Sequence, residues 1–280
     1  MVNKLSVSAQ KKIRIQLSVS LLFVILIIAL AMMGSIIAPH DPYKTNLLLA
    51  HLSPSRQFPF GTDHLGRCVL SRILSGASIS VFSAIAVVLI ASLIGVALGV
   101  IAGYAGGFID SFIMRITTIF QAFPYFLMAV AVAGMLGIGL FNGMLSLIAV
   151  FWTSYARLGR SLILGIKDEA YVKAARICGA GGHHIILKYM LPNIGSPLLV
   201  KGILDISAVV LSMAGLSFLG LGAQRPTAEW GAMMSEAKNY LQTAPWVVVF
   251  TGLALFIVVV GFNYLGDSLR SRMDSKATGK

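Results

Sequence analysis

The longest stretch of the chain without a charged residue runs from Ile116 to Ala156, between Arg115 and Arg157. A transmembrane helix needs about 20 predominantly apolar residues, so this stretch is long enough for two membrane crossings. Inside lipid every backbone N–H and C=O group must be hydrogen bonded, which a helix achieves within its own segment. Only 11% of the residues are charged, whereas soluble domains carry about 25%. The sequence therefore predicts an all-α polytopic membrane protein.

Apolar runs along the chain predict six transmembrane helices. They cover Leu17–Ala38, Ile79–Ala102, Ile116–Gly137, Ile138–Ala156, Pro197–Leu221 and Trp246–Gly266. The third and fourth runs are adjacent, and the glycine cluster from Gly134 to Gly143 is the expected bend between them. Pro124 is expected to kink the third span. Five spans with a re-entrant segment are the alternative interpretation.

Lys and Arg residues are unevenly divided between the connecting segments. If the N-terminus is cytoplasmic, the basic residues outside are Lys44, Arg56, Arg67, Arg72, Arg225 and Lys238, while Lys201 lies near or within a span and the others lie inside. Short loops follow the positive-inside rule, so both termini are predicted to be cytoplasmic, and the net charge of +12 requires no nucleic acid partner. Cys68 and Cys178 then lie on opposite sides of the membrane and cannot form a disulfide. The first apolar run is longer than a signal-peptide core, which favours an uncleaved span.

The spans divide the chain into five parts. These are a cytoplasmic tail (1–16), the first span (17–38), an extracytoplasmic loop ending in a short surface helix at Cys68–Leu74 (39–78), a five-helix core (79–268) and a second cytoplasmic tail (269–280). The loop holds His40, His51 and His64, whose irregular spacing favours ordinary loop histidines over a metal site. In the second span, Gly95, Gly99 and Gly103 form a stripe that lets another helix approach closely. That stripe either faces a pore or packs within the chain.

A polar segment rich in Lys and Arg, residues 168–192, interrupts the core on the cytoplasmic side; we call it the docking segment. Asp168 is expected to cap a short helix, since its side chain can accept a backbone N–H. Gly179 is expected to end that helix in a left-handed conformation. A second helix is expected from His183 to Leu191, with Pro192 ending it.

Four residues of the first short helix recur at helical spacing. Tyr171, Ala174, Ala175 and Cys178 are predicted to form one small, smooth face. Small side chains permit close approach to a groove on a partner protein. A helix that merely lay on the membrane would carry Leu, Phe or Trp on its buried face. The sequence therefore favours docking of a soluble partner over a surface helix that only connects two spans.

Two further pairs of polar residues are candidate site residues. Lys201 and Asp205 are four residues apart in the fifth span, where charges usually face a cavity or a partner. They line a translocation path or a contact between permeases, or they form a self-neutralising pair with Lys201 reaching towards the interface. Glu229 and Trp230 lie in the external loop after that span. They form a lip that contacts a binding protein, or the tryptophan pins the loop at the membrane interface.

The sequence lacks three common motifs of nucleotide-binding and catalytic sites. It contains no Gly-x4-Gly-Lys-Ser/Thr phosphate loop, no His-Glu-x-x-His and no Gly-x-Ser-x-Gly. We expect no enzyme activity, no catalytic or metal-binding residue and no cofactor on this chain. If ATP drives transport, hydrolysis must take place on separate subunits that hold the ATP and Mg.

The docking segment resembles a known element. Ala174-Ala175, Gly179 and Leu191-Pro192 have the spacing of the EAA loop of ABC-importer permeases, which contacts the ATPase subunits. More specifically, the chain resembles the C-type permeases of the peptide/nickel importer family. The further matching motifs are Gly61-Thr-Asp-His-Leu-Gly-Arg67 with Ser71-Arg72, Leu216-Ser-Phe-Leu-Gly-Leu-Gly-Ala223, Pro226-Thr-Ala-Glu-Trp-Gly-Ala232, Ala244-Pro-Trp246 and Asn263-Tyr-Leu-Gly-Asp-Ser-Leu-Arg270.

This resemblance implies a type I ABC-importer permease fold in the bacterial inner membrane. It also implies a homologous second permease that completes the pore, two cytoplasmic ATPase subunits and an extracytoplasmic solute-binding protein, besides the surrounding membrane lipid. The implied ATPase-docking residues are Glu169, Tyr171, Ala174, Ala175, Gly179, Leu191 and Pro192. Lys173 stands where the family usually has the glutamate after which the loop is named, so the usual salt bridge to the ATPase is not carried over.

The local sequence of three short stretches resembles that of the nickel permeases most. They are Gly61–Cys68, Pro226–Gly231 and Gly252–Phe256. The expected cargo is therefore nickel, free or chelated, and a di- or oligopeptide is the alternative from the same family. A gradient-driven secondary carrier or channel is the alternative from another class, and a membrane-embedded enzyme would need a ligand or nucleophile cluster that the sequence lacks.

Overall fold

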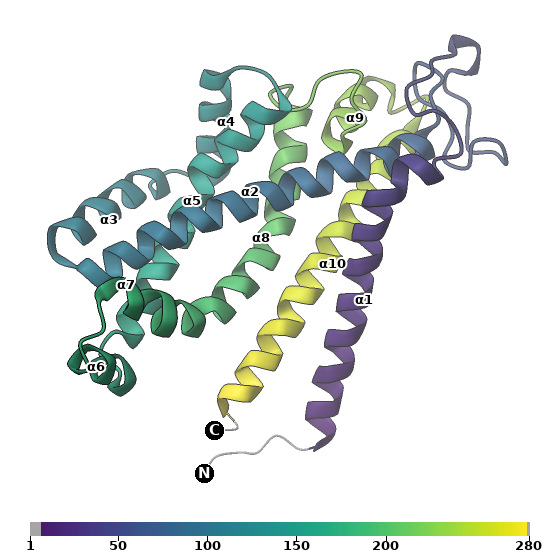
Figure 1. The fold of residues 1–280 in the computed structure, drawn as a ribbon. Coiled ribbons are helices and arrows are strands. Elements are labelled where there is room, and N and C mark those ends of the chain that lie inside the picture. Colours follow the sequence, from purple (N-terminus) through teal and green to yellow (C-terminus); the bar gives the residue numbers. More distant parts are fainter. Residues whose placement is uncertain (1–6, 279–280) are drawn as a thin grey trace.

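A computed structural model describes residues 7–278, and within this range the predicted all-α class is confirmed (Figure 1). The long helices are α1 (Val7–Ile37), α2 (Val69–Ala105), α3 (Gly107–Gln121), α4 (Tyr125–Leu136), α5 (Leu140–Ile166), α8 (Leu191–Phe218) and α10 (Pro245–Thr278). The short ones are α6 (Ala170–Ile177), α7 (Gly182–Ile185) and α9 (Trp230–Ala237), with 3₁₀ turns at Leu47–Leu49 and Lys238–Tyr240 and a π-helical turn at Ile186–Met190.

Four of these helical stretches are long and apolar enough to cross a membrane. They are Lys11–Ile37, Val69–Ala105, Gly182–Phe218 and Pro245–Met273. The pair α3 and α4 would make a fifth, but the two helices are bent by 91°. The span predicted for Ile116–Gly137 is therefore broken into two helices at Pro124 rather than merely kinked, because a proline disfavours helical backbone at the residue before it; this geometry fits either a broken span or a re-entrant segment.

Helix α5 covers the predicted fourth span and continues to Ile166. It contains Asn142, Arg157 and Arg160, which lower its apolarity, so its length alone argues for a crossing. By length and apolarity the described residues thus hold four or five spans, and a count of six stays a prediction.

Several element boundaries differ from those predicted. The surface helix expected at Cys68–Leu74 is not separate, because Cys68 is the N-cap of α2 and the residues after it form the largely buried start of that helix. The two predicted tails are helical as far as they are described, since α1 begins at Val7 and α10 continues to Thr278. Residues 1–6 and 279–280 of the tails lie outside the described residues.

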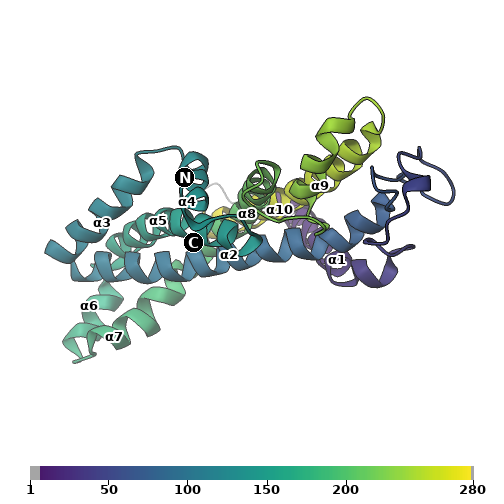
Figure 2. The ribbon, with the colours of Figure 1, turned by 90° about the horizontal axis from the view of Figure 1, so that it is seen from above.

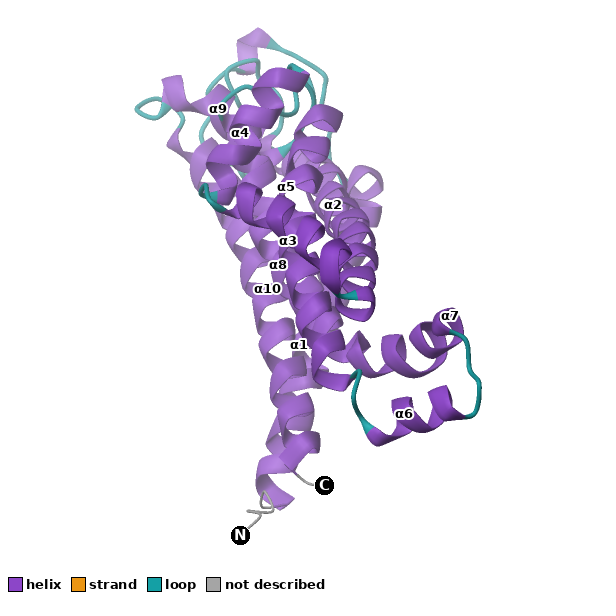
Figure 3. Cartoon of the chain, turned by 90° about the vertical axis from the view of Figure 1, so that its left-hand side faces the viewer, coloured by secondary structure: helices purple, strands orange, loops and turns teal. Residues whose placement is uncertain are grey.

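The two ends of the molecule differ in character. The start of α1, the end of α10 and the docking segment lie at one end, whereas the 38–68 loop and α9 lie at the other (Figures 1 and 3). In Figure 3, α6 and α7 stand out to one side of the bundle. The docking segment therefore lies at the same end as the start of α1 and the end of α10, and the side of the membrane that this end faces stays a prediction.

Helix α2 runs along the molecule from the 38–68 loop towards the end that carries α6 and α7 (Figure 2). Its glycine stripe faces α5: a methyl group at Gly95 would collide with the Trp152 carbonyl oxygen, and one at Gly99 with that of Ala156. At Gly103 the added carbon would lie 2.9 Å from Ile163 Cγ2. Of the two interpretations of the stripe, a face on a pore or packing within the chain, the structure supports the second. The stripe brings the backbones of α2 and α5 into contact.

We predict that Gly99→Ala destabilises the permease by about 1–3 kcal/mol, since the two backbones must separate to admit the methyl group. Thermal unfolding in detergent measures the effect. The matched control is Gly165→Ala on α5, where an added carbon meets nothing within 4 Å. Equal melting temperatures for the two variants would contradict the packing described here.

Candidate functional site

The first helix of the docking segment, α6, is bounded much as the sequence indicated. Its end is a Schellman motif: Gly179 has φ +80°, its N–H donates to the Arg176 carbonyl at 3.1 Å, and the Ala180 N–H donates to the Ala175 carbonyl at 3.0 Å. The left-handed role of Gly179 is confirmed. The start is one residue later than predicted, because Glu169 rather than Asp168 occupies the N-cap, and no side chain caps the helix.

The two faces of α6 have different surroundings. Val172 is fully buried and Ala175 is 8% exposed, whereas Tyr171 is 39% and Ile177 87% exposed. Ala174 and Cys178 are also exposed. The predicted smooth face is therefore wrong in one member, since Ala175 turns inward. The apolar spacing of Val172 and Ala175 was the missed signal.

The inward face of α6 belongs to a small hydrophobic cluster that we call the docking cluster. Its buried members are Val100 of α2, Ile163 of α5, Val172 and Ala175 of α6, Ile185 of α7, Met190 of the π turn and Ile194 of α8. Helix α2 also touches the segment through Tyr104, whose hydroxyl oxygen lies 2.9 Å from where a Cβ of Gly182 would be. The segment thus rests on the ends of three long helices.

The second half of the docking segment differs from the prediction. Pro192 does not end a helix but lies in the first turn of α8, where its missing N–H is tolerated. The preceding wide π turn at Ile186–Met190 connects α7 to α8 without a loop. Leu191 is half-buried and Pro192 is exposed. The segment is therefore continuous with the long helix that follows it.

A second candidate site is a cavity of about 430 Å³ beside the α3–α4 break. Lys201 and Asp205 of α8 line it, together with Gln121 of α3 and Thr153 of α5. Lys201 Nζ lies 2.8 Å from Asp205 Oδ2 and 4.9 Å from the centre of the Tyr155 ring. The two charges therefore form the expected pair and also face a cavity. None of the lining residues is a histidine, cysteine or methionine, so the cavity lacks the softer ligands that nickel and its neighbours favour.

Glu229 and Trp230 are not the external lip that was considered. Glu229 is 1% exposed and accepts hydrogen bonds from the N–H groups of Gly231 (3.0 Å) and Ala232 (2.9 Å) as the N-cap of α9. Burial raises the pKa of its carboxyl group, and these hydrogen bonds oppose the shift. Trp230 is 2% exposed and its Nε1–H donates to the Ile73 carbonyl at 3.1 Å. Both residues pin α9 to α2 inside the protein, which excludes direct contact with a binding protein in this conformation.

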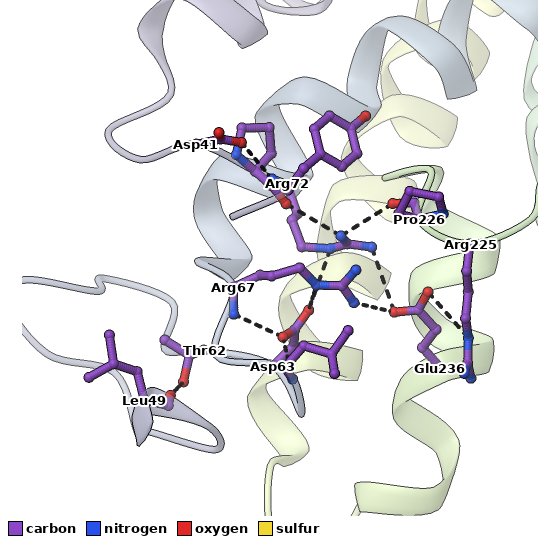
Figure 4. A network of polar contacts seen from close by, with 12 residues as sticks. Asp41, Leu49, Thr62, Asp63, Arg67, Arg72, Arg225, Pro226 and Glu236 are labelled. Atoms are coloured by element: carbon purple, nitrogen blue, oxygen red, sulfur yellow. Dashed lines mark hydrogen bonds and ion pairs between the residues drawn. The ribbon is translucent and has the colours of Figure 1, made fainter. Parts of the chain in front are cut away.

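The outer end contains a buried ion network that the sequence analysis did not identify as a site (Figure 4). We call Asp63, Arg67, Arg72 and Glu236 the outer network; each is 5% exposed or less. Arg67 donates to Asp63 Oδ2 at 2.6 Å through Nε and to Glu236 Oε2 at 2.5 Å through Nη2. Arg72 lies 3.6 Å from Asp63 and 3.7 Å from Glu236. The network joins the 38–68 loop, α2 and α9.

The same region brings three metal-ligating types together. Ligand atoms of Asp63, His64 and Glu236 lie within 4.8 Å of one another, beside a cavity of about 10 Å³. Both carboxylates, however, are already bonded to Arg67. Burial lowers the pKa of His64, whose ring stacks on Tyr240 with centroids 5.1 Å apart. A cation would have to displace a guanidinium group, so the residues present do not fit a metal ion.

Comparison with known proteins identifies the family. Residues 95–278 match the family described as the binding-protein-dependent transport system inner membrane component. The chain belongs to this family. The predicted resemblance to peptide and nickel permeases is confirmed, and the protein is an inner-membrane permease of ABC importers in the peptide/nickel group.

Three relatives from Escherichia coli cover almost the whole permease. The probable D,D-dipeptide transport system permease protein DdpC (strain K12) is 40% identical over 261 residues, 93% of this chain and 88% of the relative. The nickel transport system permease protein NikC (strain K12) is 37% identical over 255 residues, 91% and 92% of the two chains. The glutathione transport system permease protein GsiD (O6:K15:H31) is 42% identical over 262 residues, 92% and 86% of the two chains.

The fold of the permease has been seen before in a solved structure. A chain of the inward-facing MetNI methionine ABC transporter superposes with a TM-score of 0.55 at 19% identity, covering 72% of this permease and 95% of that chain. The shared fold is that of a membrane-embedded importer subunit.

We predict that Arg67→Met loosens the outer end of the permease, because it leaves Asp63 and Glu236 buried without their main partner. Removing one member of a buried pair costs about 3–5 kcal/mol. Limited proteolysis of the 38–68 loop should become at least tenfold faster. The control is Arg225→Gln: Arg225 lies 3.6 Å from Glu236, but its side chain is 69% exposed. Equal cleavage rates in the two variants would show that the network does not hold the loop.

Proposed function

We propose that this permease forms one half of a translocation pore and is moved by ATPase subunits through the docking segment. In this proposal six segments cross the membrane with both termini in the cytoplasm, the bent α3–α4 pair and α5 each counting as a crossing. A second permease completes the pore, two cytoplasmic ATPases hold ATP and Mg, and a solute-binding protein delivers cargo outside.

The observation that carries this proposal is the construction of the docking segment. Its outer face presents Tyr171, Ala174 and Ile177 to solvent, and an isoleucine that is 87% exposed gains stability when a partner covers it. Its inner face is anchored by the docking cluster to α2, α5 and α8. A partner that pushes on the outer face therefore pushes on three long helices together. Neither a gradient-driven carrier nor a membrane enzyme requires such an element.

The cavity beside Lys201 and Asp205 is the candidate translocation path of this half of the pore. ATP binding on the partner subunits would move the docking segment, and the ends of α2, α5 and α8 would follow because they share the docking cluster. The cavity walls belong to α5 and α8 and to the α3–α4 break, so their positions change with those helices.

For the cargo we propose nickel, carried as a chelate rather than as a bare ion. Two observations support nickel: the local sequence of Gly61–Cys68, Pro226–Gly231 and Gly252–Phe256, and the 37% identity to NikC. The cavity offers one cation, one anion and no soft ligand, which suits a chelate with charged groups better than a free divalent ion. A peptide is the second candidate, because DdpC and GsiD are 40% and 42% identical and a peptide also carries both charges.

We predict that Ala174→Phe abolishes the coupling of ATP hydrolysis to transport. The residue is exposed, so the variant should fold and assemble, yet the added ring should keep the ATPase away. Uptake by the reconstituted importer should fall at least tenfold and ATP hydrolysis should lose its stimulation by the loaded binding protein. Gly165→Phe, also in open space but outside the segment, is the control and should retain uptake. Normal uptake in Ala174→Phe would reject the docking role.

Competitive uptake distinguishes the cargo classes. Cells carrying the intact transporter genes, and cells lacking this gene, are given radiolabelled Ni²⁺ with and without excess histidine as a chelator, and separately a radiolabelled dipeptide. The proposal expects gene-dependent Ni²⁺ uptake that chelation enhances. Gene-dependent uptake of the dipeptide alone would instead establish the peptide alternative, and no gene-dependent uptake of either would reject both.

A further inference from the structure

Helix α3 is held between two breaks in the backbone. Gly106, its N-cap, and Gly107, its first residue, have φ of +67° and +55°, and the 91° turn at Pro124 follows it. Ile113 and Thr117 are the only buried side chains of this fully described helix, while Phe108 is 83% exposed. Apolar packing therefore fixes α3 weakly to the rest of the permease.

Polar contacts attach α3 to α5 instead, and they recur along both helices. Asp110 accepts hydrogen bonds from Nε and Nη2 of Arg160, the second at 2.5 Å. Farther along, Arg157 Nη2 donates to Thr118 Oγ1 at 3.4 Å. Gln121 Nε2 donates to Thr153 Oγ1 at 3.3 Å. We call these three contacts the polar ladder; its rungs advance along α3 while they go back along α5, so the two helices run antiparallel.

The strongest rung lies beside the docking cluster. Arg160 precedes Ile163 of that cluster by three residues on the same helix, and its backbone is part of the close crossing with α2 at Gly99 and Gly103. A guanidinium group that binds a carboxylate through two hydrogen bonds fixes both distance and orientation. Separating the two side chains would break both hydrogen bonds at once, so Asp110 is expected to follow Arg160 when α5 moves.

The opposite rung lies at the cavity. Gln121 and Thr153 both line the space that contains Lys201 and Asp205, and Gln121 is the last residue of α3 before the break. The polar ladder thus extends from the docking cluster at one end to the cavity at the other. The break at Pro124 lets α3 move without carrying α4 rigidly with it.

We propose that Asp110 and Arg160 are positioning residues for import: their ion pair makes α3 follow α5, so that a movement of the docking segment reaches the cavity wall at Gln121. This inference rests on the proposed function. It assigns no contact with cargo to either residue. Their role is to transmit a displacement, and the loss of the pair should separate ATP hydrolysis from transport rather than prevent hydrolysis.

The test compares Asp110→Asn, Arg160→Lys and the exchanged pair Asp110→Arg/Arg160→Asp in the complete importer with its binding protein in proteoliposomes. The readout is uptake of radiolabelled Ni²⁺ or dipeptide per ATP hydrolysed, with complex yield and melting temperature measured alongside. We expect at least a fivefold fall in this ratio for Asp110→Asn. The fall should be smaller for Arg160→Lys, because lysine keeps the charge but not the paired hydrogen bonds. The exchanged pair should substantially recover the ratio. If Asp110→Asn does not assemble, Arg160→Lys and the exchanged pair carry the test.

An unchanged ratio in the single variants would overturn the inference, and so would a lowered ratio that the exchanged pair does not restore although it assembles normally. Arg225→Gln, which removes an exposed partner of Glu236 at the far end, is the control and should leave the ratio unchanged. Ala174→Phe is measured in the same preparations. If it also leaves uptake normal, the proposed function itself has failed; if it uncouples while Asp110→Asn does not, only the inference has failed.

Discussion

The backbones of α2 and α5 touch because Gly95, Gly99 and Gly103 offer no side chain to the helix that crosses them. Close contact of this kind leaves little freedom for one helix to slide on the other, since any movement drives a carbonyl oxygen into a neighbouring backbone. The docking cluster extends the same contact, because Val100 and Ile163 belong to the two crossed helices. The crossed pair therefore gives the docking segment a firm base inside the membrane.

The two ends of the permease are stabilised by different interactions, apolar packing at one and buried ion pairs at the other. At the docking end, small and aliphatic side chains pack α6 onto α2, α5 and α8, and the outer face of α6 is left free. At the outer end, buried charges of the outer network hold the 38–68 loop to α9 (Figure 4). Charges buried in pairs tolerate little displacement, because a separated pair leaves each partner desolvated. With the proposed drive at the inner end, a fixed outer end suits a subunit that rocks rather than stretches.

Local patterns in the sequence predicted local structure well. Glycine spacing predicted the close helix packing of α2, and Gly179 predicted the end of α6, because each depends on the backbone freedom or size of one residue. The break at Pro124 was predicted only as a kink, since a proline restricts its neighbours without specifying the angle that follows. Pro192 was misread for a related reason: a proline ends a helix or begins one, and the preceding π turn that decides between these has no sequence signature.

Contacts between distant residues were the main omission. Glu229 and Trp230 are polar or amphipathic residues in a loop, and their burial depends on α2, more than 140 residues earlier in the chain. The outer network joins Arg67 to Glu236, and the polar ladder joins Asp110 to Arg160; no local spacing indicates either pair. The nearly complete burial of Ala175 was missed for the same reason. Helical spacing shows which residues share a face of α6, but not which face packs against the rest of the protein.

A distance measurement tests the rigid connection between the docking segment and α2 most directly. Cys178 lies beside the outer face of α6, so it is replaced by Ser, and spin labels are attached at Leu187→Cys in the π turn of the docking segment, which is 50% exposed, and at Leu93→Cys on α2, which is 71% exposed; the remaining Cys68 is buried. Pulsed electron–electron double resonance on the complete importer compares the nucleotide-free and ATP-bound states, and a further label on the second permease reports the movement between the two permeases. The account predicts that the distance to the second permease changes while the distance between positions 187 and 93 stays constant. A change of several ångströms within this chain, with uptake intact, would contradict it.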